Sequence, residues 1–234
     1  MKESVLTARQ LVRTYGKGKT AVHALRGADL EVARGTFVAL RGRSGSGKTT
    51  LLNLVGGLDR PDGGTVTLEG QDLAQLSDTQ LTHLRRHRLG FVFQTFSLLP
   101  VFSAYENVEL ALRLAGARGR QRDRRVFELL EMVGLAEKAR HRPFELSGGE
   151  QQRAGIARAL ANSPAIILAD EPTGDLDSAT GLGIIRLFRD VVETQGVTVL
   201  VATHDPAVTE NAHLTYEMVD GRVYTLERPA EGNP

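Results

Sequence analysis

Apolar residues in this chain gather in short runs that each end in a polar cluster. Residues 36–40, 165–169 and 197–202 are apolar almost throughout, as is typical of strands buried on both faces of a parallel sheet. A stretch with the pattern of a helix follows each of these runs. The pattern predicts an α/β fold with an open, mainly parallel sheet, and ligands of such sheets bind beyond the carboxyl ends of the strands.

The remaining segments complete this outline. Alternating or short apolar runs predict further strands at 4–15, 21–32, 65–69, 89–93, 213–219 and 222–227. Helical periodicity predicts helices at 51–55, 72–88, 104–115, 122–133 and 154–161, and from a turn at 172–177 to about residue 194. Ser77 is an expected helix N-cap, and residues 228–234 are an expected frayed tail.

A glycine-rich loop joins the first buried run to the helix-like stretch at 51–55. The loop consists of Gly42, Arg43, Ser44, Gly45, Ser46, Gly47, Lys48, Thr49 and Thr50. This sequence matches the G-x-x-x-x-G-K-[ST] pattern between a strand and a helix, so its backbone N–H groups and the positive helix end are expected to hold phosphates. Lys48 can reach the β- and γ-phosphates, and the Thr49 hydroxyl can ligate Mg²⁺. The loop therefore favours binding of a nucleoside triphosphate over a glycine-rich turn without a ligand.

Polar side chains follow the strands that are expected beside this loop. They are Gln94, Asp170, Glu171 and His204. Because the carboxyl ends of parallel strands share one edge of a sheet, we expect these side chains to meet Lys48 there. Taken alone, an Asp-Glu pair at a strand end is also typical of a helix N-cap region.

Two further features bear on a nucleotide site. Tyr15 lies at a strand end and can stack on an adenine ring, although an aromatic residue is also ordinary at such a position. Ser147, Gly148 and Gly149 come immediately before the helix expected at 154–161 and form a second potential anion site.

Composition limits the classes of function. The net charge is +1, so no overall field attracts the chain to nucleic acid, and we expect no nucleic-acid partner. The absence of cysteine excludes disulfides and thiolate sites. No apolar run approaches the roughly 20 residues of a transmembrane helix, and the N-terminus lacks the apolar core of a signal peptide. We therefore expect an intracellular protein that reaches a membrane only through a partner.

Two groups of basic residues have competing interpretations. His83 and His87 lie four positions apart and could share a metal ion, but no third ligand is near, so a solvated basic helix face is favoured. The linker at 116–125 is strongly basic, which favours a solvated turn, with contact to anionic lipid as the alternative.

Residues 146–153 read Leu-Ser-Gly-Gly-Glu-Gln-Gln-Arg and are similar to the LSGGQ-type element of ABC transporter ATP-binding subunits. The strand-end residues named above fall in the order of that family, and the resemblance extends from Tyr15 to about Gly221. Phrases at 24–27, 51–59, 89–94, 98–100 and 106–108 resemble the macrolide-export and lipoprotein-release (MacB/LolD) group. Two positions depart from the pattern: Arg43 stands where a Pro is common, and Asp175 where the subgroup usually has Asn.

The resemblance implies one ABC ATP-binding domain over residues 1–234. Its P-loop NTPase fold would have a RecA-like, mainly parallel core, an N-terminal antiparallel β portion and a helical subdomain inserted at roughly 95–160. ATP and Mg²⁺ are the implied cofactors, and Mg²⁺-dependent ATP hydrolysis is the implied activity. Glu171 would polarise the attacking water, and His204 would contact the γ-phosphate or hold Glu171 in place. Thr49, Gln94 and Asp170 would ligate Mg²⁺, and Asp175 adds a carboxylate near the nucleotide.

The resemblance also implies two kinds of partner. One is a second copy of the chain, whose Ser147-Gly148-Gly149 element would cap the γ-phosphate of the first copy. The other is an integral membrane permease, which would hold the chain at the cytoplasmic face of the cell membrane. Its expected dock is the apolar segment 96–102, with anchors at Phe96, Leu98, Leu99 and Phe102; a small local core under the helix at 104–115 is a compatible alternative. A soluble ABC-type ATPase acting on DNA or ribosomes is the competing function, whereas a P-loop kinase or GTPase does not explain residues 146–153.

Overall fold

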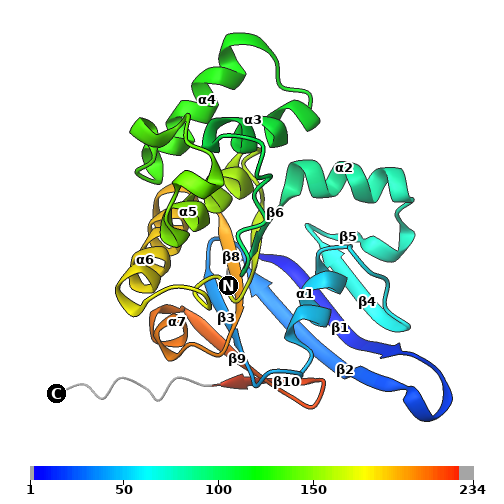
Figure 1. Cartoon of the computed structure of the whole chain (residues 1–234). Helices are drawn as coiled ribbons and strands as arrows, with labels where there is room; N and C mark the ends of the chain where they lie inside the picture. The colour runs from blue at the N-terminus through cyan, green and yellow to red at the C-terminus, as the bar shows by residue number, and fades with distance from the viewer. Residues whose placement is uncertain (1–2, 227–234) are drawn as a thin grey trace.

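The computed structural model describes residues 3–226, which form two sheets with helices packed around them (Figure 1). The larger sheet has the strand order β10-β9-β3-β8-β7-β6. Its strands are β3 (Phe37–Arg41), β6 (Leu89–Phe93), β7 (Ile166–Asp170), β8 (Thr198–Thr203), β9 (Leu214–Val219) and β10 (Arg222–Leu226). Strands β9, β3, β8, β7 and β6 pair in parallel, and β10 pairs with β9 in the antiparallel sense. The predicted α/β fold with a mainly parallel sheet is confirmed.

The smaller sheet is antiparallel and comes from the N-terminal part of the chain. Its order is β2-β1-β4-β5, and its strands are β1 (Ser4–Tyr15), β2 (Val22–Ala33), β4 (Gly63–Leu68) and β5 (Gln71–Asp72). Helix α1 (Lys48–Val55) contacts strands of both sheets. The antiparallel sheet and α1 therefore cover one face of the parallel sheet.

The strands of the parallel sheet are apolar throughout because both of their faces are buried. Successive side chains of a strand point to opposite faces. Phe37 and Ala39 belong to a core that includes residues of α3 to α6, whereas Val38 and Leu40 belong to a second core with α1 and the antiparallel sheet. This double burial explains why the runs at 36–40, 165–169 and 197–202 do not alternate between apolar and polar residues.

The remaining helices lie around the parallel sheet. They are α2 (Asp78–Arg88), α3 (Ala104–Leu114), α4 (Gly119–Met132), α5 (Gly148–Leu160), α6 (Ser178–Gln195) and α7 (Pro206–Asn211), with short 3-10 turns at Gly18–Thr20, Leu73–Gln75, Ala136–Lys138 and Pro143–Glu145. Helices α3, α4 and α5 pack on one another at one end of the molecule (Figure 1). The helical subdomain predicted at roughly 95–160 includes these three helices, and its boundaries remain a prediction.

Two predicted helices have different starting points in the structure. The helix predicted at 72–88 begins only at Asp78, because Asp72 pairs in β5 and its carboxylate accepts a hydrogen bond from the backbone N–H of Ala74. Ser77 is the N-cap of α2, as predicted. Helix α4 begins at Gly119, so most of the basic linker at 116–125 is helical. The tail predicted at 228–234 lies outside the described residues.

Candidate active site

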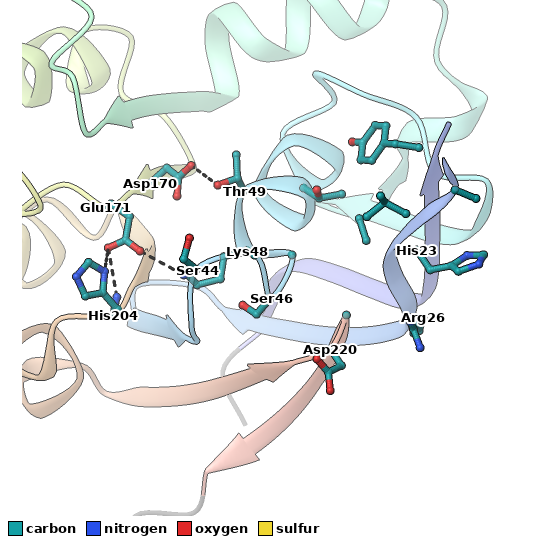
Figure 2. Close-up of a pocket in the computed structure, with 18 of the residues that line it drawn as sticks. His23, Arg26, Ser44, Ser46, Lys48, Thr49, Asp170, Glu171, His204 and Asp220 are labelled. Atoms are coloured by element: carbon teal, nitrogen blue, oxygen red, sulfur yellow. Dashed lines mark hydrogen bonds and ion pairs between the residues drawn. The ribbon is translucent and has the colours of Figure 1, made fainter. Parts of the chain in front are cut away.

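A cleft of about 810 Å³ lies where the loop between β3 and α1 meets the carboxyl ends of β6, β7 and β8 (Figure 2). Of the residues predicted for the site, it is lined by Tyr15, Ser44, Gly45, Ser46, Gly47, Lys48, Thr49, Thr50, Gln94, Asp170, Glu171 and His204. Gly42 and Arg43 line a second cleft of about 790 Å³, which shares residues 44–46, His204 and Asp220 with the first. Four other predicted residues line neither cleft: Ser147, Gly148, Gly149 and Asp175.

Part of the lining comes from residues that the sequence did not predict. The cleft also contacts Ala21, Val22, His23, Ala24, Arg26, Asp220 and Gly221. These residues come from the start of β2 and from the turn between β9 and β10, which lie far from the phosphate loop in the sequence. No motif marks them, because only the folding of both sheets brings them to the cleft.

The conformation of the loop between β3 and α1 depends on its glycines. Gly45 and Gly47 have φ angles of +79° and +109°, a region that other residues adopt only with strain. A Cβ atom on Gly47 would lie 2.5 Å from the backbone oxygen of Ala24. Gly47 is also the N-cap of α1 and provides no side-chain cap for the first N–H groups of this helix. The loop therefore presents a helix N-terminus to the cleft, which suits an anion.

Lys48 crosses this loop and reaches the strand end beyond it. Its side chain is 7% exposed, and its Nζ donates to the backbone oxygens of Gly42 at 2.8 Å and Arg43 at 3.3 Å. The same atom forms an ion pair with Oε1 of Glu171 at 3.3 Å. The buried ammonium is therefore held beside the phosphate loop, where a phosphate can replace Glu171 as its anionic partner.

Thr49 and Asp170 bring two kinds of oxygen ligand together. The Thr49 hydroxyl donates to Oδ2 of Asp170 at 2.7 Å, while Oδ1 of Asp170 is buried and has no hydrogen-bond partner among the described residues. Burial raises the pKa of Asp170, and the hydrogen bond from Thr49 opposes this shift. A cation at this position would satisfy the orphaned oxygen and favour the ionised carboxylate.

The oxygen donors fit Mg²⁺ rather than a metal held by protein alone. Within residues 3–226 there is no group of three or more His, Cys, Asp or Glu side chains that could hold a metal ion. Mg²⁺ commonly takes one or two protein ligands and completes its shell with phosphate oxygens and water.

His83 and His87, the pair considered above for a metal, stack at 4.2 Å between ring centroids, and Nδ1 of His87 lies 2.8 Å from the backbone oxygen of His83.

Glu171 is held from two sides. Its backbone has a φ angle of +46°, and its Oε2 accepts a hydrogen bond from the backbone N–H of His204 at 3.2 Å. Nδ1 of His204 lies 2.9 Å from the same oxygen, opposite the ion pair with Lys48. The three side chains form a continuous polar series across the cleft (Figure 2). A carboxylate so placed can accept a proton from water next to a bound phosphate.

Tyr15 lines the same cleft and is held by two neighbouring side chains. Its hydroxyl donates to Oδ2 of Asp59 at 2.8 Å, and the Arg13 guanidinium lies 4.8 Å from its ring centroid. Arg13 also forms ion pairs with Asp59 at 2.9 Å and with Asp62 at 2.8 Å. These partners, which the sequence did not reveal, hold the ring in place while it remains 38% exposed and available for stacking on a base.

The Ser147-Gly148-Gly149 element lies at the start of α5, away from the cleft. Helix α5 begins at Gly148, so the predicted start at Ala154 is wrong: Ser147 and Glu150 form a capping box that includes both glycines in the first turn. A Cβ on Gly148 would lie 3.4 Å from Phe96 and from Leu176. One chain alone does not bring this element to its own phosphate loop.

Glu150 stabilises this helix start, and its contribution should depend on pH. The pKa of Glu150 is lowered from 4.5 to about 2. The main cause is the hydrogen bond from Lys138, and the second is the hydrogen bond from the Ser147 N–H. Because the folded-state pKa is the lower one, the stabilisation is present above pH 4.5 and is lost as the pH falls towards 2.

We expect Glu150→Gln to lower the free energy of unfolding by about 1 kcal/mol at pH 7. Urea unfolding at pH 7 and at successively lower pH should show the difference from the parent shrinking below pH 4.5. Glu131→Gln, at an exposed position of α4, is the control. A difference that stays constant with pH would contradict this account.

A family model described as ABC transporter matches residues 25–174, which is more than half of the chain. The chain belongs to the ABC transporter family. The matched stretch includes the phosphate loop, Gln94, the element at 146–153 and the Asp170-Glu171 pair.

Relatives confirm the resemblance to the MacB/LolD group. An uncharacterized ABC transporter ATP-binding protein of Thermotoga maritima is 48% identical over 92% of both chains. The lipoprotein-releasing system ATP-binding protein LolD of Geobacter metallireducens is 46% identical over 94% of this chain and 98% of its own. The macrolide export ATP-binding/permease protein MacB of Syntrophobacter fumaroxidans is 46% identical over 93% of this chain, which spans 31% of that longer protein.

Solved structures of ABC cassettes share the fold. The dimeric, post-hydrolysis structure of the ATP-binding cassette MJ0796 of Methanocaldococcus jannaschii, bound to ADP and Pi, matches with a TM-score of 0.87 and 42% identity over 96% of this chain and 100% of its own. CbiO1 of Clostridium perfringens, part of the transporter complex cbiONQ, matches with a TM-score of 0.87 and 27% identity over 95% of this chain and 88% of its own. The predicted ABC ATPase fold is confirmed.

Proposed function

We propose that the chain is the ATP-hydrolysing subunit of an ABC transporter, which dimerises around ATP and drives a separate membrane permease. The observation that carries this proposal is the meeting of Lys48, Thr49, Asp170, Glu171 and His204 in one cleft beside the phosphate loop. Family membership and the similarity to LolD and to the ADP-bound cassette support it. Release of phosphate from ATP by the purified chain, with and without Mg²⁺, is the direct test.

The residues of the cleft act on the β–γ bond of ATP. The N–H groups of the phosphate loop bind the phosphates, and Lys48 exchanges its contact with Glu171 for one with the β- and γ-phosphates. The oxygens of Thr49, Asp170 and Gln94 would hold Mg²⁺, and the bound ion would supply positive charge that neutralises the phosphates.

Glu171, released from Lys48, accepts a proton from the water that attacks the γ-phosphorus. The bond between that phosphorus and the bridging oxygen breaks, and ADP and phosphate leave. His204 fixes the carboxylate of Glu171, and we expect its ring to contact the γ-phosphate. Tyr15 stacks on the adenine ring.

Two copies of the chain complete each other's sites. Ser147, Gly148 and Gly149 lie outside the cleft of their own chain but offer the N-terminus of a 13-residue helix. A two-fold arrangement lets this element of one copy cap the γ-phosphate bound by the other, and forms both contacts at once. The similar cassette MJ0796 is dimeric, which supports the pairing of two copies.

The second partner is an integral membrane permease, which the chain joins at the cytoplasmic face of the membrane. In the part of the chain that the structure describes, no helix is long and apolar enough to cross a bilayer. The relatives named LolD and MacB belong to a lipoprotein-releasing system and to macrolide export. We propose that a separate protein provides the membrane passage for this subunit.

The segment 96–102, which follows Gln94, is the proposed dock. The structure divides its apolar residues: Leu98 packs against the core and Phe96 and Phe102 are half-buried, whereas Leu99 and Val101 are 42% and 68% exposed. Phe96, Leu98 and Phe102 therefore suit the local core considered from the sequence, and Leu99 and Val101 suit the dock. Leu99 and Val101 are the better anchors for a permease helix.

Asn107 of α3 holds this segment in shape. Its buried amide accepts a hydrogen bond from the Leu99 N–H at 2.8 Å and donates to the backbone oxygens of Leu99, Phe102 and Ser103 at 3.2, 3.0 and 2.9 Å. The exposed side chains are therefore presented on a fixed backbone, which reduces the entropy lost on docking.

We expect the double substitution Leu99→Ser/Val101→Ser to weaken co-purification of the permease at least tenfold, because two exposed apolar anchors are lost. ATP binding by the isolated chain should not change, since neither side chain lines the cleft. Leu114→Ser/Phe127→Ser removes comparably exposed apolar residues from α3 and α4 and is the control. Full co-purification by the first variant would place the dock elsewhere.

A further inference from the structure

Gln94 and Asp175 are 81 positions apart in the sequence but touch in the structure. Nε2 of Gln94, directly after β6, donates to Oδ1 of Asp175 at 2.8 Å. Asp175 lies in the turn between β7 and α6. Gln94 lines the nucleotide cleft, whereas Asp175 does not. The Asp175 carboxylate therefore contacts Gln94, a residue of the cleft, without lining the cleft itself.

The glycine before Asp175 allows this approach. A Cβ atom on Gly174 would lie 3.1 Å from Nε2 and 3.2 Å from Cδ of Gln94. Contacts this short are tighter than most side chains accept, so a larger residue at 174 would require the Gln94 amide to shift. Glycine at position 174 therefore leaves room for the Gln94 amide beside the Asp175 carboxylate.

The chemistry of the pair fixes which end of the amide is available. An ionised carboxylate only accepts hydrogen bonds, so it must face the NH₂ end of the Gln94 amide. An Asn at 175 could either donate or accept and would permit both orientations of that amide. Among the described residues, Oε1 of Gln94 accepts no hydrogen bond. Asp175 therefore leaves the oxygen of Gln94 free while it binds the nitrogen.

We propose that Asp175 is a positioning residue, which orients Gln94 so that Oε1 serves as a ligand for the divalent cation that accompanies ATP. This inference rests on the proposed function, because it assigns a role at the same nucleotide site. The cation site already offers the Thr49 hydroxyl and the orphaned Oδ1 of Asp170. A residue that hydrogen-bonds to a metal ligand, without contacting the metal itself, commonly sets much of the affinity of the site.

The test measures cation binding rather than turnover. Glu171→Gln serves as the parent, so that ATP stays intact, and Mn²⁺ serves as the probe because its free form is counted by EPR. We expect Asp175→Asn to weaken Mn²⁺ binding by the protein–ATP complex about tenfold. Mg²⁺-free ATP binding and the unfolding temperature should not change.

Asp177→Asn is a matched control in the same turn. It removes the same charge, does not contact Gln94, and keeps a residue that can cap α6 as the Asp177 side chain does now. Equal weakening by Asp177→Asn would mean that turn charge sets cation affinity, and would overturn the proposal.

A double-mutant cycle shows whether Asp175 acts through Gln94. With Gln94→Ala already present, Asp175→Asn should cause no further weakening. The same tenfold loss in that background, or no loss in the parent, would overturn the proposal. A parent chain that binds no ATP would instead contradict the proposed function, so the two failures are distinguishable.

Discussion

Glu171→Gln should lower the rate of ATP hydrolysis by a factor of about 10² to 10⁴, the usual effect of losing a general base. The amide keeps the shape of the carboxylate but accepts no proton from water. It also ends the ion pair with Lys48, which frees the ammonium for phosphate. ATP binding should therefore be retained, and a dimer should accumulate because its ATP is not consumed.

Phosphate release and light-scattering mass, each with and without ATP, measure both effects. Glu137→Gln changes an exposed carboxylate outside the cleft and is the control. Hydrolysis at the parent's rate would remove Glu171 from its proposed role. A monomer with ATP at high protein concentration would count against the dimer.

Lys48→Ala should abolish hydrolysis and weaken ATP binding by roughly 100-fold, the loss of hydrogen bonds between a charged donor and phosphate. The side chain is buried at the phosphate loop, so no other lysine can replace it. Fluorescent-nucleotide titration measures the affinity, and Lys19→Ala, in the exposed turn before β2, is the control.

The unfolding temperature must be followed as well, because Lys48 also binds the backbone oxygens of Gly42 and Arg43. Normal ATP affinity in a folded Lys48→Ala chain would contradict the assignment of the phosphate loop.

The sequence predicted the fold where a local pattern decides the structure. Buried strands such as 165–169 are recognisable because both faces are apolar, and Ser77 is recognisable as an N-cap by its hydroxyl. The start of α5 was missed because two glycines after Ser147 suggested a loop, whereas the Ser147–Glu150 capping box outweighs their low helix propensity. Helix α7 was also missed, although Asp205 caps it and Pro206 occupies its first turn.

The sequence predicted only those site residues that lie in motifs or directly after strands. The gathering of Lys48, Asp170, Glu171 and His204 followed from parallel topology. The Arg13–Asp59 support of Tyr15 and the contact of Gln94 with Asp175 did not, because both join residues from separate elements without any pattern in the sequence. Likewise, only packing shows that Leu98 faces the core while Leu99 and Val101 remain exposed.

The central claim is that ATP joins the phosphate loop of one copy to the Ser147 element of another. The chain contains no cysteine, so single cysteines report contacts cleanly. In the Glu171→Gln background, one copy would carry Ser44→Cys and the other Ser147→Cys, with a short thiol crosslinker added to the mixture. Thr79→Cys, exposed on α2, replaces either partner as the control.

The account predicts that ATP produces a crosslinked pair of the Ser44→Cys and Ser147→Cys copies, and that neither the control mixtures nor the ATP-free sample does. Absence of this crosslinked pair in saturating ATP, while both variants bind ATP, would contradict it.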